Sequence, residues 1–146
     1  MKLSSNLQTR VYPSRIKGSA AAPPSKSHTQ RALLAALLAE GKSELIHPGD
    51  SEDEWHMLET IRQLGAVTHP TENGWLIEGG IKSPDNNREI SMGESGLGIR
   101  LITPVAAMLP GTTTLTGSGS LRERPMFPFE QTLQEAGGHC RTQEGY

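Results

Sequence analysis

The sequence predicts an α/β fold built from two copies of a βαβα unit of about 70 residues. Four helical segments alternate with five short strands, and the order of elements in the first half recurs in the second. Arg31 and Arg100, each near the start of a helix, lie 69 positions apart, and Gly41 and Gly111, each just after that helix, lie 70 apart. A spacing that recurs in this way indicates an internal repeat.

The first copy is predicted to contain two helices. One runs from about Ser27 to Glu40, because Ser27 and Gln30 form a capping-box pattern and Gly41 is a natural stop. The other spans about Asp53 to Leu64, with apolar residues at helical spacing and acidic residues in its first turn, where the positive end of the helix dipole favours them. Three short strands are expected between and after these helices, at Glu44–His47, Ala66–His69 and Trp75–Glu78. The dipeptide Asn73-Gly74 predicts a hairpin between the last two.

The second copy has the same order but ends early. Its strands are expected at Glu89–Met92 and Thr113–Thr116, and its helices at about Gly96–Leu109 and Pro128–Ala136. No segment matches the return strand that closes the first copy. A sheet edge left open in this way is a liability unless something pairs with it. We therefore expect the chain to be a truncated piece of a longer protein.

Composition excludes several classes of function. The 146 residues include 14 Lys and Arg against 16 Asp and Glu, a net charge of −2 that argues against a nucleic-acid partner. The longest apolar stretch, Ala32 to Ala39, is far too short to span a membrane. A single cysteine, Cys140, forms no intramolecular disulfide and fits a reducing, cytoplasmic location. The five histidines are scattered without metal-ligand spacing, so we expect no metal.

The segment Pro24–Arg31 carries the strongest local signal of chemistry. Lys26, Ser27 and Arg31 occupy the first turn and a half of a predicted helix. Free N–H groups and the helix dipole favour anions there, and an arginine can bind a carboxylate or phosphate with two hydrogen bonds. The segment therefore predicts an anion site, although a helix cap followed by a surface arginine explains the same residues.

Two later segments repeat this arrangement. Ser91–Arg100 places three glycines and Ser95 before a helix, but its order of glycines differs from the dinucleotide-binding fingerprint, so a Rossmann fold is excluded. A tight turn between strand and helix accounts for it equally well. Ser118–Pro125 carries Arg122 and Arg124 before the last helix. Solvated charges explain the pair in isolation, whereas the repeat favours at least one arginine facing the same site as Lys26.

Taken in order, these motifs resemble the 5-enolpyruvylshikimate-3-phosphate (EPSP) synthase family over about residues 14 to 138. The matching segments are Pro24-Ser25-Lys26-Ser27 with Arg31, Asp50-Ser51-Glu52-Asp53, Gly93 and Gly96 with Arg100, and Arg122-Glu123-Arg124-Pro125-Met126. The sister family that acts on UDP-N-acetylglucosamine usually has Lys-Asn where this chain has Lys26-Ser27, so it is the second-ranked resemblance.

The resemblance implies a fold and a reaction. The family transfers the enolpyruvyl group of phosphoenolpyruvate to the 5-hydroxyl of shikimate 3-phosphate in aromatic amino acid biosynthesis, releases phosphate and needs no metal or cofactor. Its two domains each contain three copies of a small α/β unit, with the active site between them. Residues 1–20 would then belong to the other domain. Residues 21–146 would form a partial substrate-binding domain of two repeats, about 21–80 and 88–146.

The resemblance also implies residue roles. Lys26 is expected to be catalytic and to face both substrates, Ser27 and Arg31 to bind shikimate 3-phosphate, Arg124 to bind phosphoenolpyruvate, and Gly96 to line the phosphoenolpyruvate pocket.

Other positions bear on the function of the chain by itself. Arg100 is expected to be structural. Glu94 and Leu97 stand where the family usually has asparagine and threonine, changes that bear on phosphoenolpyruvate contacts and on sensitivity to the inhibitor glyphosate. Because half of the catalytic groups would lie outside these 146 residues, we expect the chain alone to be inactive. The alternatives are a non-catalytic anion-binding or regulatory module on the same fold, and a purely structural α/β domain.

Overall fold

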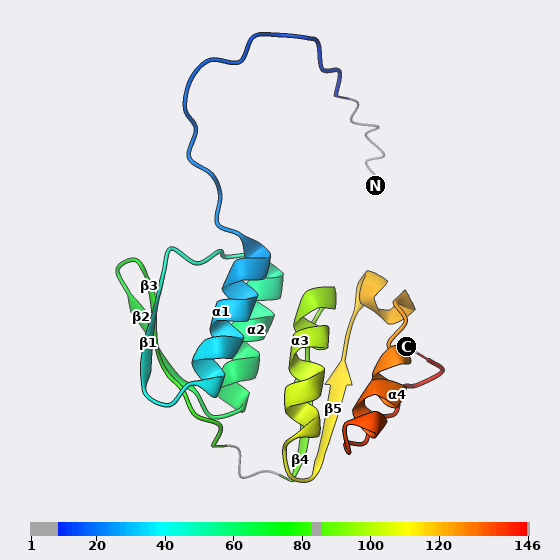
Figure 1. Cartoon of the computed structure of the whole chain (residues 1–146). Helices are drawn as coiled ribbons and strands as arrows, with labels where there is room; N and C mark the ends of the chain where they lie inside the picture. Colours follow the sequence, from blue (N-terminus) through cyan, green and yellow to red (C-terminus); the bar gives the residue numbers. More distant parts are fainter. Residues whose placement is uncertain (1–8, 83–85, 146) are drawn as a thin grey trace, which may run out of the picture.

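The computed structural model describes residues 9–82 and 86–145 and has the expected α/β architecture (Figure 1). Its α-helices are α1 (Lys26–Leu38), α2 (Glu52–Gln63), α3 (Gly96–Ala107) and α4 (Pro128–Glu135). Its strands are β1 (Lys42–Ile46), β2 (Val67–Thr71), β3 (Gly74–Glu78), β4 (Asn87–Ser91) and β5 (Thr112–Thr116). A 3₁₀ helix, η1 (Gly119–Glu123), was not expected from the sequence.

The two copies form sheets of different kinds. In the first copy β3 lies between β1 and β2 and pairs antiparallel with both. The predicted hairpin between β2 and β3 is confirmed, but its two connecting residues are Glu72 and Asn73, and Gly74 already belongs to β3. In the second copy β4 and β5 pair in parallel, with Asn87 opposite Thr112, and α3 is the crossover between them.

The repeat is visible in where the elements begin. Helices α1 and α3 begin at positions 26 and 96, and strands β1 and β5 at positions 42 and 112, so both pairs are 70 positions apart. Gly41 and Gly111 precede the strands with φ angles of +101° and +80°, which side chains rarely tolerate. The copies differ at their outer ends. The βαβα order predicts a strand before the first helix, but residues 9–25 are exposed and contain none. No strand follows α4 in residues 136–145.

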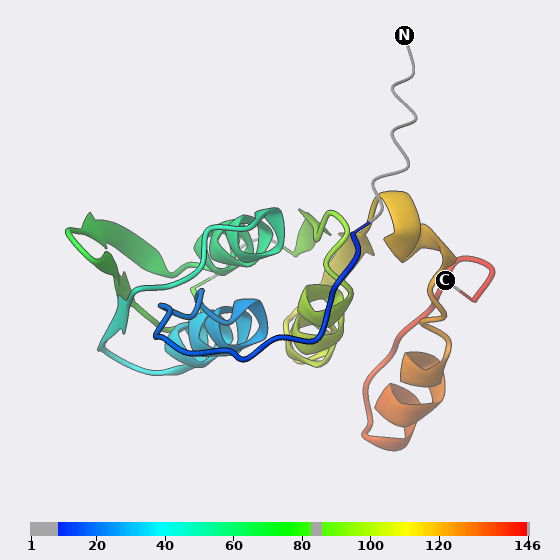
Figure 2. The same ribbon diagram turned by 90° about the horizontal axis from the view of Figure 1, so that it is seen from above.

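One hydrophobic core holds the two copies together. Helices α1, α2 and α3 lie side by side (Figures 1 and 2). Strands β1 and β3 contact α1, β4 contacts α2, and β5 contacts α3. The fully buried side chains come from both copies: Leu37, Met57, Ile61, Leu64 and Ile77 from the first, and Ile90, Met92 and Ile102 from the second. Burial of this apolar surface is the main source of stability. Because the core is shared, it also fixes how the helix starts of the two copies lie relative to each other.

The start of α1 differs from the sequence prediction. The N-cap is Ser25, whose hydroxyl accepts a hydrogen bond from the backbone N–H of His28, so the expected capping box of Ser27 and Gln30 is wrong. Ser27 lies inside the helix, and Gln30 is fully buried. Two serines at positions 25 and 27 both offer a capping hydroxyl. Burial of Gln30 between the helices selects the first of them.

Candidate functional site

Helices α1, α2 and α3 all begin at the same end of the molecule, and η1 lies at that end too (Figure 1). Lys26 is the first residue of α1, Asp53 lies in the first turn of α2, and Gly96 is the first residue of α3. The first N–H groups of a helix have no partner within the helix, and the dipole makes that end positive. This end of the fold is therefore electrostatically suited to anions, as the sequence predicted for α1 and α3.

A buried amide connects the three helix starts. The Nε2 of Gln30 donates to the Oγ of Ser95 at 2.7 Å and to the backbone carbonyl of Asp53 at 3.0 Å. Ser95 is the N-cap of α3, and its hydroxyl also accepts from the N–H of Gly98 at 3.0 Å. Gln30 thus fixes the start of α3 and the first turn of α2 against α1. The sequence pattern predicts only a capping role for Gln30, and its burial in the fold reveals the link.

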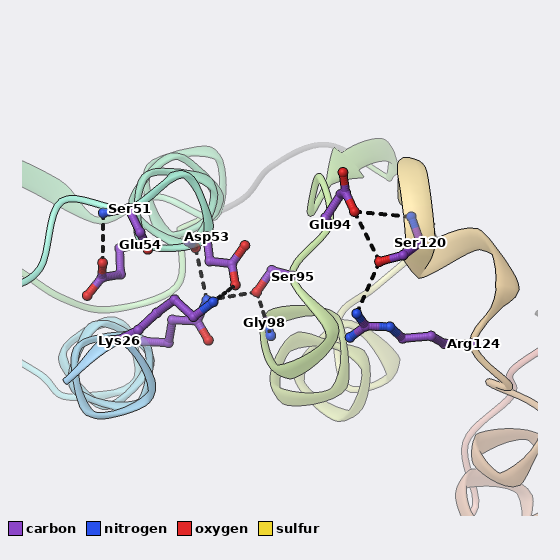
Figure 3. A network of polar contacts seen from close by, with 10 residues as sticks. Lys26, Ser51, Asp53, Glu54, Glu94, Ser95, Gly98, Ser120 and Arg124 are labelled. Atoms are coloured by element: carbon purple, nitrogen blue, oxygen red, sulfur yellow. Dashed lines mark hydrogen bonds and ion pairs between the residues drawn. The ribbon is translucent and has the colours of Figure 1, made fainter. Parts of the chain in front are cut away.

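Lys26 is paired with an acidic neighbour. Its Nζ lies 2.7 Å from the Oδ2 of Asp53, and the two side chains are 57% and 20% exposed (Figure 3). The hydrogen bond to Asp53 raises the pKa of Lys26 above its ordinary value, and the charges of Asp53 and Glu54 act in the same direction. The positive charge of Arg124 acts in the opposite direction on this pKa. Lys26 is therefore a charged ammonium held by Asp53.

Arg124 lies against the start of α3 and forms part of a second polar network. Its Nη2 donates to the Oγ of Ser120 at 3.1 Å, and Glu94 accepts hydrogen bonds from both the Oγ and the N–H of Ser120 (Figure 3). Gly96 leaves room for the guanidinium, because a Cβ at this position would collide with the Nη1 of Arg124. The structure thus brings Gly96 and Arg124 together, as expected if both serve one ligand.

The remaining predicted residues make contacts within their own helices. The Nη1 of Arg31 donates to the carbonyl of Ser27 at 3.2 Å, so these two lie on one face of α1. The Nη1 of Arg100 donates to the carbonyl of Gly96 at 2.7 Å, which supports the structural role expected for Arg100.

Asp53 and Ser120 were not singled out from the sequence as partners of the two cations. Asp53 belongs to an acidic first turn and to a segment that resembles the family, but neither pattern predicts a contact with Lys26. For Ser120 the sequence carried no signal, because its contact with Arg124 depends on a 3₁₀ turn.

Two negative findings apply to the described residues. In residues 9–82 and 86–145, no three His, Cys, Asp or Glu side chains are grouped so that they could hold a metal ion. No helix in the same ranges is long and apolar enough to cross a bilayer.

The protein is a repeated α/β domain in which helix N-termini and cationic side chains lie at one end of the fold. The sequence profile of EPSP synthase (3-phosphoshikimate 1-carboxyvinyltransferase) matches residues 11–146. The chain belongs to the EPSP synthase family, whose members are transferases of the shikimate pathway.

Relatives of known name and structure agree with this assignment. The chain is 38% identical over 144 residues to 3-phosphoshikimate 1-carboxyvinyltransferase of Halobacterium salinarum, covering 98% of this chain and 33% of that protein. It is 39% identical over 125 residues to the protein of that name from Methanocaldococcus jannaschii, covering 83% and 29%. The structure of EPSP synthase from Acinetobacter baumannii superposes with a TM-score of 0.76 at 28% identity, covering 88% of this chain and 30% of the other. The chain spans about a third of the length of these relatives.

Proposed function

We propose that this chain supplies one part of a site that transfers the enolpyruvyl group of phosphoenolpyruvate to the 5-hydroxyl of shikimate 3-phosphate and releases phosphate. The observation that carries the proposal is the position of Lys26 and Arg124. Lys26 is the first residue of α1, and the guanidinium of Arg124 lies beside Gly96, the first residue of α3. Both substrates are anions, and cationic side chains beside helix N-termini suit such ligands.

Each residue has a distinct role in this proposal. Lys26 is a catalytic residue that contacts both substrates and stabilises negative charge that develops during transfer. Ser27 and Arg31, on one face of α1, bind shikimate 3-phosphate. Arg124 binds phosphoenolpyruvate, and Gly96 lines the same pocket because it leaves the guanidinium unobstructed.

The proposal includes the division of labour within the whole protein. Residues 1–20 belong to a second domain, and residues 21–146 form a partial substrate-binding domain of two repeats, about 21–80 and 88–146. General acid–base catalysis needs groups held within hydrogen-bond reach of the substrate, and the rest of these groups lie outside this chain. The chain alone therefore binds ligand without turnover. As the family resemblance implies, the reaction needs no cofactor. A location in the cytoplasm is supported by the single cysteine.

Titration of the isotope-labelled chain with phosphoenolpyruvate and shikimate 3-phosphate, followed by NMR, tests the binding. We expect shifts at the starts of α1 and α3, and a Kd for phosphoenolpyruvate that rises about tenfold to a hundredfold in Lys26→Ala or Arg124→Ala, since each removes a charged hydrogen bond. Lys42→Ala is the matched control, because it removes the same charge from β1, which follows the far end of α1. Equal affinity in all three variants contradicts the proposed site.

A phosphate-release assay with both substrates tests the prediction that the chain alone is inactive. We expect no turnover by the purified chain. Phosphate release that is lost in Lys26→Ala would show instead that these residues suffice for catalysis.

A further inference from the structure

The contacts of Arg124 follow a fixed order of donors and acceptors. The Nη2 of Arg124 donates to the Oγ of Ser120, so the hydroxyl acts there as an acceptor. The same oxygen lies 3.0 Å from the Oε2 of Glu94. A carboxylate only accepts, so the hydroxyl hydrogen points toward Glu94 and a lone pair faces the arginine. The negative charge of Glu94 thus fixes which way the Ser120 hydroxyl points.

The loop that carries Ser120 is itself held in place. The backbone N–H of Ser120 donates to Glu94 at 3.1 Å, and the N–H of Ser118 donates to the carbonyl of Gly93 at 2.7 Å. Gly119 between them has a φ of +49°, and a Cβ there would collide with the carboxyl group of Glu94. Leu121, the next residue after Ser120, is buried in the core. Ser120 is therefore a fixed anchor for Arg124, although its own side chain is exposed.

The position of Ser120 between Glu94 and Arg124 determines how many N–H donors of the guanidinium stay available. A guanidinium has five N–H donors in a planar fork. A direct bidentate pair with Glu94 would use two of them and largely neutralise the charge. Here one donor is held by a neutral hydroxyl, while Nη1 is aimed at the start of α3, beside Gly96. The arginine is oriented and keeps its remaining donors.

We propose that Ser120 and Glu94 are positioning residues for Arg124, acting as a relay in which the carboxylate orients the hydroxyl and the hydroxyl holds the guanidinium over the first residue of α3. The inference rests on the proposed role of Arg124 in binding phosphoenolpyruvate. It assigns a function to Glu94, the position where this chain differs from the asparagine usual in the family it resembles. An amide can donate as well as accept, so it would not fix the direction of the hydroxyl in this way.

The experiment uses the whole 146-residue chain and two separate measurements. NMR relaxation of the Arg124 side chain in the free protein reports whether the guanidinium is held. Titration with phosphoenolpyruvate reports whether that order affects binding. The variants are Ser120→Ala, which breaks the relay without changing charge, Ser120→Thr, which keeps the hydroxyl, and Glu94→Ala, which removes the carboxylate.

Two matched controls separate the relay from general effects. Ser118→Ala removes a hydroxyl two residues away that makes no capping hydrogen bond in η1. Glu89→Ala removes an exposed carboxylate from β4, the strand that leads to Glu94. Backbone spectra confirm that each variant is folded.

We expect Ser120→Ala and Glu94→Ala to make the Arg124 side chain mobile, and Ser120→Thr and both controls to leave it ordered. Ser120→Ala should raise the Kd for phosphoenolpyruvate about threefold to tenfold, the effect of one hydrogen bond, and Ser120→Thr should restore it. An Arg124 side chain equally ordered in Ser120→Ala and in the unmodified chain overturns the relay. If the unmodified chain does not bind phosphoenolpyruvate while Arg124 still loses order in Ser120→Ala, the relay stands and the proposed binding role fails.

Discussion

Gln30 and Ser95 belong to different copies of the repeat, and a hydrogen bond of 2.7 Å from Nε2 to Oγ joins them in the interior. Both side chains are fully buried. The second hydrogen of the same amide reaches the carbonyl of Asp53, so one side chain in α1 sets the positions of the first turn of α2 and the N-cap of α3. Of the residues proposed to bind ligand, Lys26 and Ser27 lie in the first turn of α1, and Gly96 is the first residue of α3.

We predict that Gln30→Met destabilises the protein by about 1–3 kcal/mol, because the substitution preserves volume but leaves the buried Oγ of Ser95 and the part-buried carbonyl of Asp53 without their donor. Urea unfolding followed by circular dichroism measures the difference in the free energy of unfolding. Gln63→Met is the control, since Gln63 is exposed at the end of α2 and its replacement should change stability by no more than about 0.5 kcal/mol. Equal stability of the two variants would show that the buried amide does not hold the helix starts.

We predict that Asp53→Asn lowers the pKa of Lys26 toward its ordinary value of 10.5, because the hydrogen bond and the charge of Asp53 are what raise it. A raised pKa in the folded state means that the ion pair stabilises the fold below pH 10.5 and that this contribution is lost as the pH rises through the folded-state pKa. An NMR titration of the Lys26 side chain measures the shift.

Asp50→Asn serves as the control for this titration, since Asp50 is an exposed acid near the start of α2 and is not a cause of the Lys26 shift. A Lys26 pKa that stays raised in Asp53→Asn would contradict the prediction. The same variant should bind phosphoenolpyruvate about twofold to fivefold more tightly, because the ligand no longer competes with a carboxylate for the ammonium.

We predict that acid releases the C-terminal residues from α4. Glu130 accepts hydrogen bonds from both the backbone N–H and the hydroxyl of Thr142, and these bonds lower the pKa of its carboxyl group below the ordinary value of 4.5. A lowered pKa means that the contact stabilises the fold above pH 4.5 and is lost as the pH falls through the folded-state pKa. The amide NMR signal of Thr142 should therefore move with a midpoint below pH 4.5, and it should be free of this transition in Glu130→Gln.

The sequence predicts helices and strands correctly where a single local signal determines them. Gly41 and Gly111 lie 70 positions apart, each between a helix and the strand that it directly precedes, and both have a positive φ angle that favours glycine. The parallel pairing of β4 and β5 follows from the helix between them. The start of α1 was predicted wrongly because two serines compete for one cap, and the choice depends on the tertiary burial of Gln30.

The sequence predicts the cationic residues of the candidate site but not the residues that contact them. Lys26 is predicted from its position at a helix start and Arg124 from the motif before the last helix, and their roles stay predictions. Asp53 pairs with Lys26 from 27 positions away along the chain, and Ser120 accepts a hydrogen bond from Arg124 four positions away. Ion pairs and relays of this kind depend on which helix starts become neighbours, and that is decided by the shared core.

Two glycines in the first turn of α3 allow a test that separates binding from folding. A Cβ at position 96 would meet the ends of two flexible arginines, colliding with the Nη1 of Arg124 and lying 3.1 Å from the Nη1 of Arg100. A Cβ at position 98 would instead collide with the Cε of Met92 and lie 2.7 Å from the Oγ of Ser95, and both of these side chains are buried. The two positions differ in whether the neighbours can move.

We predict that Gly96→Ala leaves the free energy of unfolding within about 0.5 kcal/mol of the unmodified chain or raises it, because alanine favours helix and the arginines can shift. Gly98→Ala should lower it by about 1–3 kcal/mol, because buried side chains must leave their positions. Binding of phosphoenolpyruvate should weaken in Gly96→Ala, since the displaced Arg124 no longer lies over the start of α3. Urea unfolding and ligand titration of both variants give four values. A stable Gly96→Ala that binds as tightly as the unmodified chain would mean that the position of Arg124 beside Gly96 has no part in ligand binding.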